Sequence, residues 1–156
     1  MKKKMKIKWA LLIIAIISVV LTAFIGSQFT SPNTDTEWYE SIKPSITPPN
    51  YVFPIVWNIL FLLIIISFYL VLSNSKKDRK KVYFVFYLNF ILNILWSIIY
   101  FGLKNPLLSF IEIIILWGSI WLMVVYSKTI NKTASYLLIP YLLWVAFAGV
   151  LNFLSI

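Results

Sequence analysis

Residues 51–72 read YVFPIVWNILFLLIIISFYLVL, a run without a single charged side chain. A transmembrane α-helix needs about 20 consecutive, mainly apolar residues to cross the ~30 Å hydrocarbon core of a bilayer, so this run predicts a membrane span. The composition agrees, because 61% of the 156 residues are hydrophobic and only 12% are charged. A soluble domain of this size has too much surface to carry so little charge.

Four further apolar runs lie around this one. The predicted helices cover about residues 9–25, 51–72, 82–103, 106–126 and 134–156, with a polar outer loop at 26–50. We therefore predict an all-α integral membrane protein whose single domain, 1–156, is a bundle of five transmembrane helices. The basic start also resembles a signal peptide. However, its apolar run is longer than usual and no Ala-x-Ala cleavage site follows, which favours a retained span.

The lysines and arginines predict the orientation of the bundle. Twelve of the 14 fall on one side of the predicted spans: Lys2, Lys3, Lys4, Lys6, Lys8, Lys76, Lys77, Arg79, Lys80, Lys81, Lys128 and Lys132. Only Lys43 and Lys104 fall on the other. Cytoplasmic loops carry the excess of basic residues, so we expect a cytoplasmic N-terminus in a multi-pass protein of the cell membrane. A basic patch at 76–81 for nucleic acid or anionic lipid stays an alternative, but topology alone accounts for the +9 net charge and we expect no nucleic acid partner.

The side-chain inventory argues against most classes of enzyme. The chain has no Cys and no His, which removes thiolate nucleophiles, the commonest metal ligands and the commonest general base. Only five acids remain: Asp35, Glu37, Glu40, Asp78 and Glu112. We expect no metal site, and an enzymatic activity without conventional acid–base machinery is left open.

One face of the third predicted helix is polar and aromatic. Its residues recur at offsets 0, 4, 7, 8 and 11, which places them on one side of a helix: Asn89, Asn93, Trp96, Ser97 and Tyr100. Amides in hydrocarbon need partners, so this face should point into the bundle. Asn89 fits a structural hydrogen bond to a neighbouring helix, whereas for Asn93 a structural role and a ligand-binding role are equally supported.

The second and fifth predicted helices bring further aromatic residues to a similar depth. Trp57 lies about 10 Å below the outer end of its helix, from the 1.5 Å rise per residue. On the fifth helix, Tyr141, Trp144 and Ala148 share a face, and a small residue one turn from an indole leaves room beside the ring. Helix packing would also use Ala148, but we expect these groups to converge on one cavity beneath the outer loop.

The outer loop itself is rich in proline and carries apolar side chains. Trp38, Tyr39, Ile42 and Ile46 would waste apolar surface in a flexible linker, and prolines such as Pro48 restrict the unfolded chain. We interpret the loop as a lid over the outer mouth of the bundle.

Three residues of the fourth predicted helix have an open role. Glu112 is the only acid inside a span, and an intramembrane carboxylate is a functional candidate by default. It lies about 9 Å from the outer end of its helix, close enough to reach water or Lys104, so a structural or neutralised role is favoured. Trp117 and Trp121 could line a cavity, but lipid-facing or packing roles are favoured for this i, i+4 pair.

Three spaced blocks of sequence resemble a known family. They are Trp38-Tyr39-x-x-Ile42-Lys43-Pro44-x-x-x-Pro48-Pro49-x-x-x-Phe53-x-x-Val56-Trp57, Leu88-Asn89-x-x-x-Asn93-x-x-Trp96-Ser97-x-x-x-Phe101-Gly102 and Pro140-Tyr141-x-x-Trp144-x-x-x-Ala148-x-x-x-Asn152. Together they resemble the tryptophan-rich sensory protein family, which includes the mitochondrial translocator protein, or peripheral benzodiazepine receptor. The resemblance covers about residues 9 to 154.

This resemblance implies a five-helix bundle, commonly a homodimer, with a ligand cavity beneath the first loop. It implies porphyrins and benzodiazepine-site compounds as ligands, and in some members light-dependent breakdown of protoporphyrin. On matching positions, the implied ligand-binding residues are Trp57, Asn93, Trp144, Ala148, Trp38, Tyr39 and Pro48, to which the helical faces add Trp96 and Tyr141. The animal members' proposed cholesterol motif is absent, since residues 149–156 contain neither Tyr nor a basic residue, and this weak motif leaves sterol binding undecided.

The expected function is thus a membrane receptor or sensor for tetrapyrroles. Indole faces can stack on a flat apolar macrocycle, and amides can donate to its polar edges. No cofactor is obligatory, and metal-free porphyrin is the expected ligand, because the usual His and Cys axial ligands of haem are missing. If photo-oxidation occurs, Trp57 and Trp144 are the candidate catalytic residues. Transport of tetrapyrroles or other small apolar ligands is the alternative, although no internal repeat of the transporter kind is seen.

Overall fold

The computed structural model describes residues 7–75 and 79–156, and regular structure there is entirely helical. Five segments are long and apolar enough to cross a membrane: Trp9–Asn33, Val52–Asn74, Arg79–Gly102, Pro106–Ile130 and Lys132–Phe153. The predicted bundle of five transmembrane helices is therefore confirmed, and the chain is a multi-pass membrane protein.

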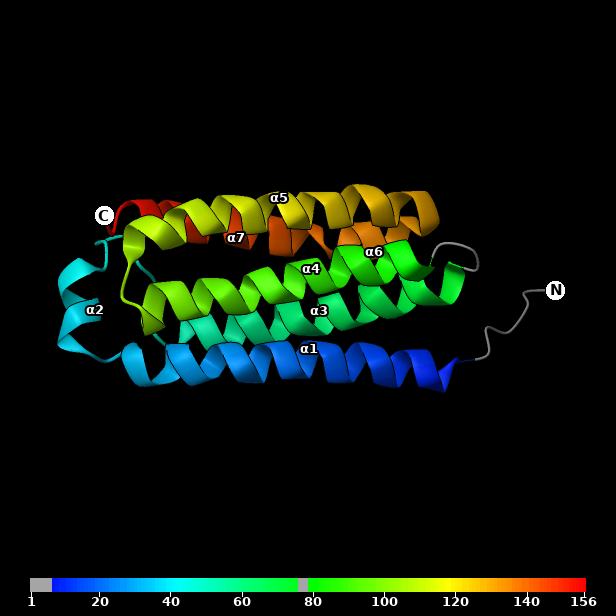
Figure 1. The fold of residues 1–156 in the computed structure, drawn as a ribbon, viewed down its shortest axis with the longest axis horizontal. Coiled ribbons are helices and arrows are strands. Elements are labelled where there is room, and N and C mark those ends of the chain that lie inside the picture. The colour runs from blue at the N-terminus through cyan, green and yellow to red at the C-terminus, as the bar shows by residue number, and fades with distance from the viewer. Residues whose placement is uncertain (1–6, 76–78) are drawn as a thin grey trace.

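The long helices lie side by side along the long axis of the molecule (Figure 1). In chain order the elements are α1 (Trp9–Thr30), η1 (Ser31–Asn33), α2 (Glu37–Ile42), α3 (Val52–Asn74), α4 (Arg79–Ser97), η2 (Ile98–Gly102), α5 (Pro106–Ile130), α6 (Lys132–Leu137) and α7 (Ile139–Phe153). The short helix α2 and the C-terminus lie at one end of the bundle, which we call the α2 end. The end of α3, the start of α4 and the α5–α6 connection lie at the opposite, basic end.

The described charges follow this division. Six described cations belong to the basic end: Lys8, Arg79, Lys80, Lys81, Lys128 and Lys132. Lys43 and Lys104 belong to the α2 end. The other six basic residues used to predict the orientation, Lys2, Lys3, Lys4, Lys6, Lys76 and Lys77, lie outside the described residues. A cytoplasmic basic end therefore stays a prediction from the charge asymmetry.

The predicted outer loop contains more helix than the sequence indicated. α1 continues to Thr30 instead of ending near residue 25, because Gly26 keeps a helical backbone and the hydroxyl of Thr30 donates to its carbonyl at 3.2 Å. A 3₁₀ turn, η1, and the short helix α2 then follow within residues 31–42. The remaining loop residues connect α2 to α3.

Asparagine side chains cap the N-termini of α5 and α6. Asn105 Oδ1 accepts from the amide of Leu108 at 2.9 Å, which caps α5, and Pro106 takes the first helical position as predicted. α5 ends at Ile130 rather than near 126. The fifth span starts at Lys132 instead of 134 and is interrupted at Leu138. Pro140 has no amide hydrogen to continue the helical ladder, which accounts for the break.

Two glycines allow the α2-end half of α1 to approach α4 and η2 closely. A Cβ added at Gly26 would lie 3.3 Å from the Ser97 hydroxyl, and one at Gly102 would lie 3.0 Å from the Phe29 ring. Small residues at such crossings let transmembrane helices pack tightly. α4 also ends differently from the expected regular helix, because η2 is a π-helical turn that buries both Tyr100 and Phe101.

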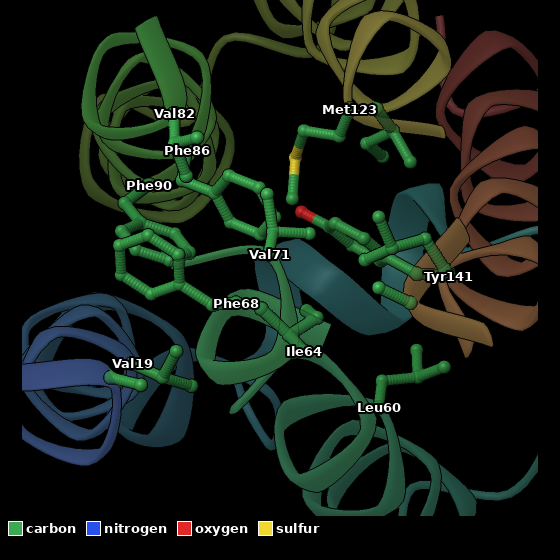
Figure 2. Packing of buried hydrophobic residues seen from close by; sticks show 14 of the residues in the cluster. Val19, Leu60, Ile64, Phe68, Val71, Val82, Phe86, Phe90, Met123 and Tyr141 are labelled. Atoms are coloured by element: carbon green, nitrogen blue, oxygen red, sulfur yellow. The ribbon is translucent and has the colours of Figure 1, made fainter. Parts of the chain in front are cut away.

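The core lies between the helices toward the basic end. Phe68 of α3 stacks on Phe86 of α4, with ring centroids 4.5 Å apart and an interplanar angle of 15°. Figure 2 shows this stack beside Phe90 and near the aliphatic side chains of Val71 and Val82, with Tyr141 reaching from α7 toward Met123 of α5. Toward the α2 end the packing gives way to a cavity, which is the candidate site.

Candidate functional site

A cavity of about 330 Å³ lies inside the bundle at the α2 end, with walls from α1, α3, α4, α5 and α7 and a cover from residues 31–50, which we call the α2 segment. Its aromatic walls comprise Tyr39, Phe53, Trp57, Phe61, Trp96, Tyr100, Phe101 and Trp144. Its polar walls comprise Thr22, Ser27, Thr30, Ser31, Thr34, Thr47, Asn50, Asn93, Ser97, Asn152 and Ser155. None of the described lining residues carries a formal charge. This combination suits a largely apolar ligand with a few hydrogen-bonding groups.

Six of the nine predicted site residues line this cavity: Tyr39, Trp57, Asn93, Trp96, Trp144 and Ala148. They come from the α2 segment, α3, α4 and α7, so the convergence expected from their depth and spacing is present. Their contact with a ligand stays a prediction.

The other three predicted site residues, Trp38, Pro48 and Tyr141, do not line the cavity. Trp38 points its ring at η2, 5.8 Å from the Tyr100 ring and 6.5 Å from the Phe101 ring. Pro48 is half-buried in the loop, where its neighbour Thr47 faces the cavity instead.

Tyr141 lies behind the wall and supports two residues that line it. It is only 1% exposed, and its ring lies edge-on to Trp57 at 6.0 Å. Its hydroxyl accepts a hydrogen bond from Asn93 Nδ2 at 3.0 Å and donates one to Asn89 Oδ1 at 3.2 Å. Tyr141 therefore fixes the positions of Trp57 and Asn93.

The polar face of α4 points into the bundle, as its spacing predicts. Asn89 Nδ2 donates to Ser119 Oγ of α5 at 2.8 Å, so the structural role favoured for Asn89 is present. Nearer the α2 end, Trp96 Nε1 donates to Asn152 Oδ1 and Tyr100 donates to Ser155 Oγ, both at 3.0 Å. Asn93 has the structural role, because it bonds Tyr141, and it also lines the cavity, where its ligand-binding role stays a prediction.

Three buried polar groups at or near the site have no hydrogen-bond partner among the described residues: Thr47 Oγ1, Trp144 Nε1 and the Glu112 carboxyl. Trp144 Nε1 is buried without a hydrogen-bond partner, although its ring belongs to the cavity wall. Glu112 is 5% exposed, and neither of its carboxyl oxygens has a hydrogen-bond partner among the described residues. Glu112 forms no ion pair with Lys104 among the described residues, and the structural or neutralised role favoured for it stays a prediction. Glu112 does not line the cavity.

The α2 segment closes the cavity on the α2 end. Thr36 caps α2, and Tyr39 packs on the Phe101 ring with centroids 5.6 Å apart. The Lys104 ammonium lies 5.7 Å from the centre of the Trp38 ring, a cation–π distance. Asn50 Nδ2 donates to Asp35 Oδ1 at 3.0 Å and joins the two ends of the loop. The expected lid is thus an ordered cover held by aromatic contacts with η2.

The environment of Tyr39 favours its neutral form. Burial raises the pKa of Tyr39 to about 12, with smaller contributions from Tyr100 and from the carboxylate of Glu40. The Glu40 carboxylate is itself paired with the Lys43 ammonium at 2.6 Å. The phenol of Tyr39 is therefore uncharged where it faces the cavity at physiological pH.

Sequence reasoning missed the contribution of α1 and of Phe53. Three residues of α1, spaced four apart, line the cavity: Thr22, Gly26 and Thr30. The two threonines contribute hydroxyl-bearing side chains, and the glycine contributes only its backbone. Small and hydroxyl residues at this spacing in an apolar helix were the available signal. The interpretation of Trp117 and Trp121 as residues outside the cavity agrees with the structure, where both are exposed on the outer face of α5.

Comparisons with known proteins agree over nearly the whole chain. A sequence profile of the TspO/MBR family matches residues 6–155. The chain is 41% identical over 143 residues to the tryptophan-rich protein TspO of Archaeoglobus fulgidus, covering 91% of this chain and 92% of that protein. It is 27% identical over 150 residues to the tryptophan-rich sensory protein of Cereibacter sphaeroides, covering 96% and 91%. It is 26% identical over 137 residues to the translocator protein of Bos taurus, covering 85% and 80%.

Proposed function

The chain belongs to the TspO/MBR family, and from this premise we propose that it is a receptor or sensor that binds a metal-free porphyrin in the cavity beneath α2. Membership of this family shows a membrane protein of the sensor or translocator kind. The cavity wall supports the proposal that the ligand is a porphyrin. Trp57 and Trp144 offer indole faces for a flat macrocycle, and Asn93 offers an amide at the same level.

The observation that carries the proposal is the unpaired indole of Trp144. Buried donors in native structures nearly always have a partner, so an unpaired one on a cavity wall invites a ligand acceptor. A metal-free porphyrin supplies two unprotonated ring nitrogens that can accept such a bond. Compounds of the benzodiazepine-site type supply carbonyl oxygens, so the same wall accommodates them.

Size and charge set the expected pose. The cavity volume of about 330 Å³ lies at the small end of the ~300–1,000 Å³ range of small-molecule sites, so a porphyrin requires the α2 cover to move outward. Because the described wall carries no charge, the porphyrin carboxylates belong at the mouth. There Ser31, Thr34 and Asn50 provide hydrogen-bonding groups.

Porphyrin titration of the purified protein tests the proposal. Protoporphyrin added to protein in nanodiscs should quench tryptophan fluorescence and shift the porphyrin absorbance, with saturation at a defined stoichiometry. Trp121→Phe is the matched control, because Trp121 is exposed on α5 and outside the cavity. Absence of saturable binding, or equal loss of binding in Trp144→Phe and Trp121→Phe, would refute porphyrin binding in this cavity.

Light-driven degradation of the bound porphyrin is a second candidate function. The same two indoles, Trp57 and Trp144, support it, since both lie on the cavity wall and indole is the most easily oxidised of the aromatic side chains. Illumination of the bound porphyrin, compared with a dark sample, separates this activity from binding alone.

A further inference from the structure

The membrane-facing surface is hollowed between α3 and α7. This groove is lined by Val56, Ile59, Leu60, Pro140, Leu143, Phe147 and Trp144, and all these side chains except the indole nitrogen are apolar. Ile59 is 55% exposed and Leu143 is 65% exposed, although both belong to membrane-spanning segments. The groove therefore faces the hydrocarbon of the bilayer.

Trp144 belongs to both the groove and the internal cavity. It is the one residue shared by the two sets of described lining residues. Its neighbour one turn along α7, Ala148, lines the cavity with a single methyl group. The indole thus stands between the cavity and the bilayer, with little side-chain bulk beside it on the inner side.

Packing alone holds the Trp144 ring in place. The indoles of Trp96 and Trp117 are each fixed by a hydrogen bond, to Asn152 at 3.0 Å and to the Leu142 carbonyl at 3.2 Å. Trp144 Nε1 has no such partner, and its ring contacts are with Phe53 at 5.8 Å and Phe147 at 5.7 Å. A change of rotamer at Trp144 breaks no hydrogen bond of its indole.

The groove lies between α3 and α7, and α7 has fewer hydrogen bonds to α3 than to its other neighbours, α4 and α5. Side-chain hydrogen bonds connect α7 to α4 through Tyr141 and Asn152, and to α5 through Asn152. Within residues 7–75 and 79–156, no hydrogen bond connects α3 to α7. The ring contacts between them are the edge-on pairs Phe53–Trp144 and Trp57–Tyr141.

We propose that the groove between α3 and α7 is a membrane-facing access site through which an apolar ligand passes between the bilayer and the cavity, with the Trp144 indole as its gate. The ligand class is a flat or elongated apolar molecule, concentrated in the bilayer, that carries a hydrogen-bond acceptor for Trp144 Nε1. The alternative path beneath α2 is lined by hydroxyl and amide groups and is covered by the loop. The inference rests on the proposed function only in that the cavity receives a ligand.

A single cysteine in the cavity wall tests this route without any ligand. The chain has no cysteine, so Ala148→Cys introduces the only thiol. Protein in nanodiscs is treated with pyrenyl maleimide dissolved in the bilayer, or with a sulfonated maleimide in the water. Adding Leu143→Trp, which fills the groove from an exposed position, should slow labelling by the bilayer reagent by about tenfold, within the range by which mutations change access rates. Labelling by the sulfonated reagent should change by less than about twofold.

Matched variants separate the groove from general effects. Ile114→Trp adds the same ring to an exposed position of α5, away from the groove, and should leave both labelling rates unchanged. Ile59→Trp fills the groove from α3 and should repeat the effect of Leu143→Trp if that variant folds poorly. Bilayer labelling that is absent in Ala148→Cys, or equally fast with the groove filled, would overturn the access route. Because the readout is thiol labelling, this result is independent of whether porphyrin binds.

Discussion

Asn93 and Tyr141 are joined between α4 and α7 by a 3.0 Å hydrogen bond, although only Asn93 faces the cavity. The tyrosine stands behind the wall and holds the amide that the ligand would meet. Positioning of the site is therefore shared between a residue on the wall and one in the core.

Tyr141→Phe should destabilise the bundle by about 1 kcal/mol, the usual scale of a hydrogen bond between membrane helices. The substitution removes the hydroxyl that accepts from Asn93 and donates to Asn89, and leaves both amides short of a partner. Reversible unfolding in mixed micelles measures the change. Tyr136→Phe, at an exposed position of α6, is the control. Equal stabilities of the two variants would mean that this hydrogen bond contributes nothing.

Trp57→Phe and Trp144→Phe should each weaken porphyrin binding by about 1 kcal/mol or less, because an aromatic face remains. Any light-driven porphyrin decay should fall much further, because phenyl is harder to oxidise than indole. Both quantities can be followed in one porphyrin absorbance experiment. If porphyrin decays in both variants at the rate of the unsubstituted protein, the two indoles have no redox role and only porphyrin binding remains as the proposed function.

Deletion of residues 36–41 should speed ligand release more than it changes helicity. The deletion removes most of α2, including the ring contacts of Trp38 and Tyr39 with η2. Trp38→Ala should reproduce part of the effect, since it removes the contacts with Tyr100, Phe101 and the Lys104 ammonium. Stopped-flow dissociation and circular dichroism provide the two measurements. An unchanged release rate in the deletion would show that α2 is no lid.

Closure of the lid should depend on pH through Tyr39. Burial raises the pKa of Tyr39 from 10.0 to about 12, so the folded lid favours the neutral phenol. The stabilisation is complete below pH 10.0 and is lost as the pH rises toward 12, since the released chain ionises more readily. Ligand release should therefore accelerate over this interval in the parent, and Tyr39→Phe should remove that acceleration. Identical pH profiles would disprove the assignment.

The orientation can be tested by cysteine labelling. A cysteine at Lys132, on the basic end, should react only from the cytoplasm, and Thr34→Cys, on the α2 end, only from outside. The third position chosen from the sequence, near Lys77, lies outside the described residues. Labelling of Thr34→Cys from the cytoplasmic side of intact membranes would show that the predicted orientation is wrong.

The sequence was most informative for polar side chains that the hydrocarbon of the bilayer excludes from the lipid-facing surface. Amides cannot face lipid, so the spacing of Asn89 and Asn93 was enough to place that face of α4 inside the bundle. The same constraint says nothing about Thr22 or Thr30, because a hydroxyl can bond its own helix anywhere in a span, as both do. The role of α1 in the site was therefore missed.

The residues of the lid were harder to assign, because their contacts depend on the exact end of α4. The π-helical turn η2 brings Tyr100 and Phe101 into contact with Trp38. No local sequence pattern predicts such a turn. Trp38 was therefore expected in the cavity and instead packs beside it. The interruption at Leu138 had a visible cause in Pro140, but a proline in a membrane helix does not by itself indicate a break.

The uncharged wall of the cavity also determines how the protein responds to an energised membrane. Moving one elementary charge through a potential of 100 mV changes its free energy by about 2.3 kcal/mol. None of the described lining residues carries a charge that could move with the ligand or with Trp144. Occupancy by a neutral ligand should therefore be the same in a polarised and a depolarised cell. An anionic porphyrin would bring its own charge into the field, so its occupancy alone would depend on the voltage.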